Sequence, residues 1–132
     1  MIQVKDVVKS FDGNVVLNHV SANFEDGKVN MIIGQSGSGK TVLMKSMIGL
    51  HQIDGGEIVF DTRAGQQNLA GMTEKEVRML HREVGMLFQG AALFDSMTVQ
   101  ENVMYPLEMF SDMSRDEMVA RARFCLERVN MP

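Results

Sequence analysis

The segment Gly34-Gln35-Ser36-Gly37-Ser38-Gly39-Lys40-Thr41 decides how this chain of 132 residues folds. It matches the pattern G-x-x-x-x-G-K-[ST] at every fixed position. The apolar residues 29–33 precede it, and apolar residues at helical spacing follow it over positions 41–50. A glycine- and serine-rich surface turn would need neither neighbour. The order of buried strand, glycine loop and helix therefore predicts a phosphate-binding loop at the head of an α/β core.

The residue types in this segment suit a polyphosphate. Glycines let the backbone curl closely around the anion and present successive N–H groups to it. The helix that starts here adds its unsatisfied N–H groups and the positive end of its dipole. Lys40 is expected to reach the β- and γ-phosphates, and the Thr41 hydroxyl to occupy one position on Mg²⁺. The residues expected to bind the nucleotide here are Gly34, Gln35, Ser36, Gly37, Ser38, Gly39, Lys40, Thr41 and Val42.

Upstream of the loop, the sequence predicts antiparallel β-structure. A strand is expected to end at Phe11, where Asp12-Gly13-Asn14 supplies residues that tolerate positive φ. Two further short strands are expected at residues 15–17 and 20–24. Residues 1–28 are thus interpreted as the start of an antiparallel β-subdomain.

Downstream of the loop, strands and helices are expected to alternate. Short apolar runs predict strands at residues 57–60 and 84–88, the latter buried, whereas the polar residues 61–71 are interpreted as a surface excursion. Capping-box patterns at residues 73–76 and 114–117 predict two helix starts, the first helix running to about Arg82. Another helix is expected over residues 100–107. The last helix carries an apolar stripe formed by Met118, Ala122, Cys125 and Val129.

Several segments together resemble the ATP-binding subunits of ABC transporters, and the resemblance extends over all 132 residues. They are Phe11 before its hairpin turn, Leu17-Asn18-His19-Val20-Ser21, Gly55-Gly56-Glu57-Ile58, Met86-Leu87-Phe88-Gln89, and Met97-Thr98-Val99 with Glu101-Asn102-Val103. The implied fold is an α/β P-loop NTPase core of the RecA-like kind, incomplete here. Residues 1–28 would begin the β-subdomain, residues 29–90 the core as far as the glutamine, and residues 91–132 the helical subdomain.

The resemblance also implies roles for two residues outside the loop. Phe11 would stack on the adenine ring, where most relatives have tyrosine, although stacking alone would not reject guanine. Gln89 would meet Mg²⁺ or the attacking water, so that Lys40 and Gln89 are the catalytic candidates and Thr41 and Gln89 the metal candidates. The alternatives without a functional role are that Phe11 is an aromatic residue packed at the end of a strand and that Gln89 is a solvated side chain at the end of a strand.

The same resemblance implies partners and a place in the cell. ATP and Mg²⁺ would be the cofactors, a second ATPase subunit would complete a homodimer, and a transmembrane permease subunit would dock through the region after Gln89. The protein would be cytoplasmic and peripheral on the membrane through that permease. Residues 84–107 are more narrowly similar to the ATPases of Mce-linked phospholipid or organic-solvent-tolerance transporters, which suggests a lipid or hydrophobic substrate.

Composition agrees with this interpretation. A net charge of −4 without any basic run argues against nucleic acid as a partner. No apolar stretch is long enough to insert into a bilayer, and a single cysteine cannot form an internal disulfide. The three histidines have no metal-ligand spacing, so packing or solvation is preferred for each of them. Asp61 could follow a metal-binding strand, but Thr62 stands where such a site would need glutamate.

The family's L-S-G-G-Q signature, Walker B carboxylates and switch histidine are absent from these 132 residues. We therefore expect the chain by itself to bind nucleotide better than it hydrolyses it. We also expect unpaired strand edges to cause oligomerisation or strand exchange. Two alternatives stay open: a non-catalytic nucleotide- or phosphate-binding fragment, and another P-loop enzyme such as a kinase or GTPase.

Overall fold

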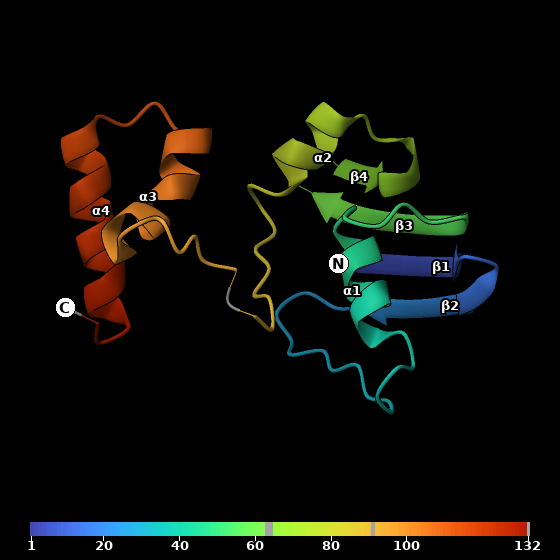
Figure 1. The fold of residues 1–132 in the computed structure, drawn as a ribbon. Coiled ribbons are helices and arrows are strands. Elements are labelled where there is room, and N and C mark those ends of the chain that lie inside the picture. The colour runs from blue at the N-terminus through green and yellow to red at the C-terminus, as the bar shows by residue number, and fades with distance from the viewer. Residues whose placement is uncertain (63–64, 91, 132) are drawn as a thin grey trace. The chain divides into compact units, whose positions relative to one another are not determined.

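The computed structural model describes residues 1–62, 65–90 and 92–131. The chain forms two compact units, Met1–Gly85 and Met86–Pro132 (Figure 1). The boundary predicted at residue 91 and the last residue of the predicted helix stop, Pro132, lie outside the described residues.

The first unit opens with a long β-hairpin. Strand β1, Ile2–Phe11, pairs antiparallel with β2, Asn14–Phe24, and Phe11 faces Asn14 across the turn. Asp12 and Gly13 both have positive φ, 48° and 83°, which is the backbone twist that suits a two-residue hairpin turn. The predicted hairpin at this position is confirmed.

Strand β2 corrects the prediction of two separate strands at residues 15–17 and 20–24. The register shifts by one residue between Val4 and Val7 on β1, shifts back between Leu17 and Val20 on β2, and shifts once more between Lys9 and Ser10. The extra residues include Asp6 and His19, which have φ values of 52° and 51° and share a hydrogen bond of 2.9 Å between their side chains. These two bulges interrupt the apolar alternation without ending the strand, so the sequence pattern alone suggests a gap that does not exist.

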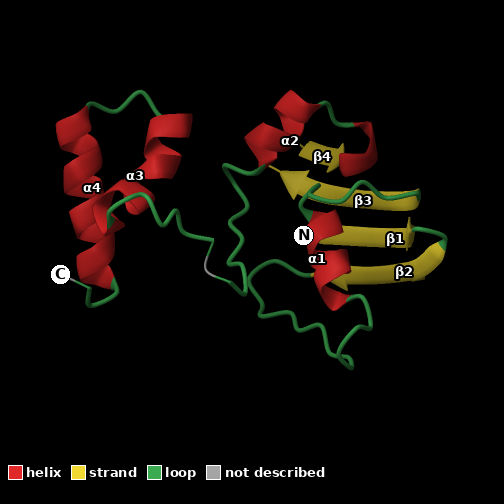
Figure 2. Ribbon diagram, in the orientation of Figure 1, coloured by secondary structure: helices red, strands yellow, loops and turns green. Residues whose placement is uncertain are grey.

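Two further strands complete an antiparallel sheet of order β2-β1-β3-β4 (Figure 2). Strand β3 is Gly55–Thr62, longer than the predicted residues 57–60, and β4 is Gly65–Asn68. The latter and the short 3₁₀ helix η1, Leu69–Gly71, lie where a surface excursion was predicted. Most of the described residues of this segment are exposed, as predicted, but the prediction did not include β4, a polar edge strand whose backbone pairs with β3 while its side chains show no apolar alternation.

One face of the sheet carries the hydrophobic core of the first unit. Helix α1, Lys40–Met47, packs on it through Leu43 and Met47, and α2, Glu74–Leu80, adds Leu80. The strands contribute Val4, Val7, Leu17, Ile58 and Phe60, all at most 3% exposed. Each such side chain is worth roughly 1.5–3 kcal/mol on burial. The core thus fixes the start of α1, and with it the loop that precedes α1.

Two predicted strands do not form. Residues 29–33 and 84–88 adopt neither helix nor strand, and Val29, Ile33 and Leu87 are 96%, 85% and 89% exposed. A strand exists only where a neighbouring backbone takes up its hydrogen bonds. The four strands in the described part of the chain pair with one another and with no residue of these two segments. The apolar runs in the sequence indicated segments that tend to be buried. They did not indicate whether a neighbouring strand would be present to pair with them.

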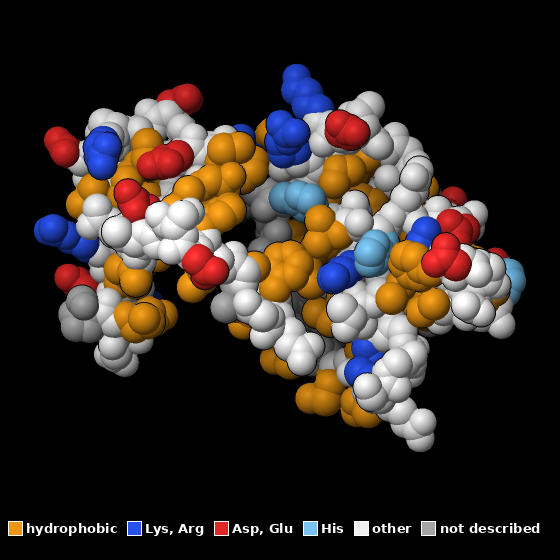
Figure 3. Space-filling view, viewed as in Figure 1, with side chains coloured by type: hydrophobic (Ala, Val, Ile, Leu, Met, Phe, Trp, Pro, Cys, Tyr) orange, Lys and Arg blue, Asp and Glu red, His pale blue; other side chains and the backbone are white. Residues whose placement is uncertain are grey.

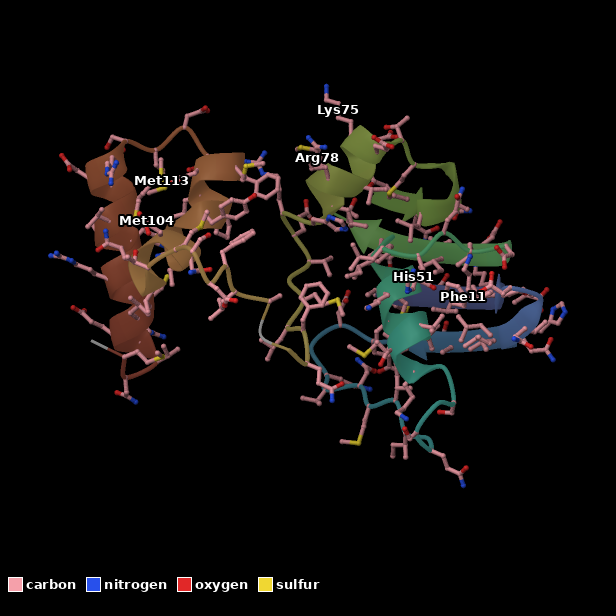
Figure 4. The ribbon with its side chains drawn as sticks, viewed as in Figure 1. Phe11, His51, Lys75, Arg78, Met104 and Met113 are labelled. Atoms are coloured by element: carbon pink, nitrogen blue, oxygen red, sulfur yellow. The ribbon has the colours of Figure 1, made fainter. Side chains whose placement is uncertain are left out.

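The second unit contains two helices, α3, Val99–Phe110, and α4, Arg115–Arg128. They pack together around Met104 and Ala122, which are 2% and 0% exposed (Figure 4 labels Met104). Helix α3 extends beyond the predicted residues 100–107. It begins with a capping box at Thr98 and Glu101 that the prediction did not use. None of the helices in the described ranges combines the length and the apolar character that crossing a membrane requires.

Candidate phosphate-binding site

The phosphate loop is a tight turn that leads straight into α1. Gly37 and Gly39 have φ of 79° and 93°, a region of backbone space that other residues enter only with strain. Within the turn the Ser38 N–H donates to the Gln35 carbonyl at 3.2 Å. The motif predicted from the sequence therefore lies, as expected, directly before a helix.

An added β-carbon would also crowd its neighbours at two of the loop glycines, most firmly at Gly39, where a backbone carbonyl lies in the way. A β-carbon on Gly34 would lie 2.6 Å from the Ser38 Oγ, and one on Gly39 would lie 3.1 Å from the Val16 carbonyl oxygen. The second distance also shows that the end of the loop rests on β2. Glycines at these positions let the backbone curl closely enough to present its N–H groups to a phosphate group.

The start of α1 presents free N–H groups. Gly39 is the N-cap and offers no side-chain hydrogen bond, and the first turn holds no acidic residue. The first intrahelical bond runs from the Leu43 N–H to the Gly39 carbonyl at 2.8 Å, so the N–H groups before it are available to a ligand. Val42 packs its side chain against the core, which leaves only its N–H for binding. This helix end therefore suits an anion.

Lys40 lies across the loop that it belongs to. Its Nζ donates to the carbonyl oxygens of Gly34 and Gln35 at 2.8 and 2.6 Å. These bonds hold the ammonium group over the glycine turn. The positive charge, the helix end and the glycine backbone thus meet at one place, where a polyphosphate would find all three.

Phe11 ends β1 in the same unit and is 38% exposed. Its ring meets the His51 ring edge to face, with centroids 5.3 Å apart and planes at 75°, and the Lys9 Nζ lies 5.0 Å from its centroid (Figure 4). The hairpin connects it with the loop: Phe11 pairs with Asn14, and Val16, which touches Gly39, is two residues further along β2. Two residues of strand span about 7 Å, and neighbouring strands are about 5 Å apart. Phe11 therefore lies within the reach of a ligand bound at the loop.

Asp54 is a residue of this region to which the sequence analysis assigned no role. Its carboxylate accepts hydrogen bonds from the Ser10 N–H at 2.6 Å and from the Lys9 Nζ at 3.2 Å. Its own N–H donates to the Val8 carbonyl at 2.8 Å. The Ser10 N–H first, and then Lys9, hold the pKa of Asp54 below its ordinary value. No local motif signals these contacts, because the partners are more than 40 residues apart in the sequence.

The remaining predicted site residues have simpler surroundings. Gln89 is exposed and belongs to the second unit, and Thr41 is exposed on the first turn of α1. Asp61 lies 3.8 Å from the N-terminal ammonium group, which favours a structural role for it. The described residues include no group of three or more His, Cys, Asp or Glu side chains able to hold a metal ion. Mg²⁺ would therefore need phosphate oxygens besides the Thr41 hydroxyl.

A cavity of about 530 Å³ in the first unit lies beside α2 rather than at the phosphate loop. Arg78 of α2 and His81 line it together with His51, and Figure 4 labels Arg78 on α2 and His51 on the segment after α1. His51 therefore contributes both to the lining of this cavity and to the surroundings of Phe11, against which its ring packs.

Comparison with known proteins identifies a family whose members this chain matches. A family model described as ABC transporter matches residues 17–132. The chain is 34% identical over 131 residues to the methionine import ATP-binding protein MetN of Rhizobium johnstonii, which covers 99% of this chain and 35% of that protein. It is also 34% identical over 140 residues to the phosphonates import ATP-binding protein PhnC of Fusobacterium nucleatum, with 99% and 54% covered. The chain thus spans between about a third and a half of these relatives.

A solved structure supports the same assignment of fold. It is a dimeric ATP-binding cassette in a post-hydrolysis state, bound to ADP and Pi, and it superposes with a TM-score of 0.84 at 28% sequence identity. The match covers 96% of this chain and 56% of that one. The chain therefore has the fold of the N-terminal part of such a cassette.

Proposed function

This chain belongs to the ABC transporter family, and from that premise we propose that it is the N-terminal region of a subunit that couples ATP binding and hydrolysis to transport. The observation that carries the proposal is the joint geometry of the glycine turn, the uncapped start of α1 and the Lys40 ammonium group. These three features converge on one anion, and the Phe11 ring lies within reach of it.

Each residue has a defined task in this proposal. The loop N–H groups and the first turn of α1 bind the phosphates, Lys40 exchanges its carbonyl partners for phosphate oxygens, and Thr41 offers a hydroxyl to Mg²⁺. Phe11 stacks on the base, and Gln89 orients water, since its amide both donates and accepts hydrogen bonds. The bound nucleotide supplies the phosphoanhydride bond whose hydrolysis would drive transport.

Assembly and substrate follow the family. The solved cassette is dimeric, which supports a second copy as partner, and a permease would hold the protein at the membrane. The reported relatives import methionine in one case and phosphonates in the other, so they do not share one substrate. They are also not of the Mce-linked kind to which residues 84–107 were expected to be similar, so that narrower expectation is wrong for these relatives and no lipid or hydrophobic substrate is proposed from it.

Titration calorimetry with Mg·ATP tests the phosphate site. Lys40→Ala removes charge-assisted hydrogen bonds worth about 1.5–3 kcal/mol, so the Kd should rise by about 10- to 100-fold. Lys75→Ala is the matched control, because Lys75 is exposed on α2 (Figure 4), and it should bind as the parent does. Equal affinities for the parent and Lys40→Ala would refute the proposal.

Steady-state turnover tests the catalytic half of the proposal. The 132 residues contain no L-S-G-G-Q segment, and phosphoryl transfer requires water, metal and phosphate to be positioned together. The chain alone should therefore bind Mg·ATP while releasing phosphate far more slowly than a complete cassette. A rate typical of a complete cassette would contradict this expectation.

A further inference from the structure

Lys9, on the inner strand β1, has a side chain that is unusually well covered for a lysine. Its side chain is only 14% exposed, whereas lysine is almost never buried unless it is paired. Two partners account for its burial: the Asp54 carboxylate at 3.2 Å and the Phe11 ring, whose centroid is 5.0 Å from the Nζ. The ammonium group is thus held between a counter-ion and the aromatic ring.

The counter-ion is itself anchored to the backbone of β1. Asp54 accepts a hydrogen bond from the Ser10 N–H and donates its own N–H to the Val8 carbonyl. Asp54 therefore ties the segment that follows α1 to the last residues of β1. His51 belongs to this segment, and the tie accompanies its packing against Phe11.

We propose that Lys9, Asp54 and His51 are positioning residues that hold the Phe11 ring ready to stack on the planar base of a nucleoside triphosphate. The inference rests on the proposed nucleotide site and names what prepares its base subsite. Lys9 occupies one face of the ring and His51 packs against it, while 38% of Phe11 stays open to solvent. A ring that is already fixed loses less conformational freedom when a base binds, which strengthens binding.

Lys9 and Lys40 have different tasks in this arrangement. The charge of Lys9 is already neutralised by Asp54, whereas the partners of Lys40 among the described residues are carbonyl oxygens, which it can exchange for phosphate. Lys9 should therefore affect the base and leave the phosphates alone. This difference separates the inference from the phosphate site itself.

The test compares the affinity for Mg·ATP with that for Mg·tripolyphosphate, which has no base. Lys9→Met keeps the aliphatic stem but removes the cation, and a cation–π contact of this kind corresponds to roughly a two- to five-fold change. Lys9→Met should weaken Mg·ATP binding by about that factor and leave tripolyphosphate binding unchanged. Lys75→Met, exposed on α2, is the matched control and should change neither.

Three further variants, one of them a double substitution, check the route through Phe11. Phe11→Leu should weaken Mg·ATP binding without affecting tripolyphosphate, and adding Lys9→Met to it should cause no further loss. Asp54→Asn removes the counter-ion and should weaken Mg·ATP selectively, as Lys9→Met does. In the ligand-free protein, the ε-methylene protons of Lys9 should be shifted upfield by the Phe11 ring current, and Phe11→Leu should remove the shift.

The outcomes separate this inference from the proposed function. Loss of both ligands in Lys9→Met would mean that Lys9 binds phosphate, and loss of neither would mean that it positions nothing; both results overturn the inference. Ordinary ε-methylene shifts in the parent protein would overturn it without any ligand. Equal affinity of the parent for ATP and tripolyphosphate would leave the phosphate site standing and remove base positioning, whereas binding of neither would refute both proposals.

Discussion

Gly39 is the single residue on which most of the loop geometry depends. It combines a φ of 93° with a close approach to the carbonyl of Val16 and the side chain of Leu17. A β-carbon there would encounter both backbone strain and crowding. The position therefore connects the stability of the sheet with the shape of the phosphate cradle.

Gly39→Ala should lower the free energy of unfolding by about 1–3 kcal/mol, through left-handed strain and overpacking. It should also weaken Mg·ATP binding, because the start of α1 has to move. Urea unfolding followed by amide signals of β1, together with calorimetry, measures both effects.

Gly13→Ala is the matched control for that change. Gly13 has a φ of 83° but nothing within 4 Å of an added β-carbon. It should lose about 1–2 kcal/mol through strain alone and keep its affinity for nucleotide. If both variants bound nucleotide as the parent does, the loop would not need glycine at position 39.

At the residue scale, the sequence predicted those site residues whose contacts are local. The glycines and Lys40 interact within a few positions of one another, so a short pattern contains their chemistry. Lys9, His51 and Asp54 could not be found in this way. Their contacts join the end of β1 to the segment after α1, and no spacing in the sequence signals that the fold brings them together.

At the scale of the elements, helices α2, α3 and α4 all begin with a capping box. In α2, α3 and α4 the N-cap hydroxyl accepts a hydrogen bond from the third helical N–H, and a glutamate at that position bonds back to the N-cap. In α4 these partners are Ser114 and Glu117. The Ser114 hydroxyl first, and then its N–H, hold the pKa of Glu117 below its ordinary value.

Ser114→Ala should cost about 1 kcal/mol of stability in the second unit, the usual cost of losing such a cap. The pKa of Glu117 should rise toward its ordinary value in this variant. A carboxyl group whose pKa is lower in the folded chain stabilises the fold above its unfolded pKa, and this contribution is lost as the pH falls through the folded pKa. The parent should therefore lose its advantage over Ser114→Ala in acid. Side-chain carboxyl NMR and thermal unfolding as functions of pH measure this.

Ser114→Thr is the control for the cap, because threonine keeps the hydroxyl. It should behave as the parent does in both measurements. An unchanged Glu117 pKa in Ser114→Ala would show that the hydroxyl and the carboxylate do not interact in solution.

The same elements explain which parts of the fold were predictable. The starts of α2 and α4 could be predicted from the capping boxes at residues 73–76 and 114–117. A capping box is formed by residues three positions apart, so a short stretch of sequence contains it. The hairpin turn at Asp12-Gly13 was equally local. Strand β4 and the unformed strands at 29–33 and 84–88 depend on pairing with distant backbone, which composition does not encode.

At the scale of the whole molecule, several large apolar side chains are exposed to solvent. In the first unit Val29, Met31 and Ile33 are 96%, 77% and 85% exposed in a segment without strand pairing. Figure 3 shows hydrophobic side chains reaching the surface of both units. Clustered apolar side chains of this kind mark sites of association or aggregation.

The chain should therefore self-associate as its concentration rises. Replacing Val29 and Met31 together with lysine should shift the protein toward the monomer, because two charges would have to be desolvated in the contact. Val129→Lys is the control, since Val129 is 62% exposed but lies after α4 in the other unit. Sedimentation velocity over a concentration series measures all three proteins. A parent that sediments as a monomer throughout would contradict the expectation.

The tie between Asp54 and β1 also restricts how the length of the chain can vary. The segment from α1 to Asp54 is held at one end by the packing of Leu43 and Met47 in the core and at the other by the bonds of Asp54 to Ser10 and Val8. An insertion between α1 and Asp54 would have to bulge outward or pull His51 away from Phe11, because both ends are held. Natural variants of this protein are accordingly expected to tolerate added residues at the Asp12-Gly13 turn sooner than in this short return from helix to sheet.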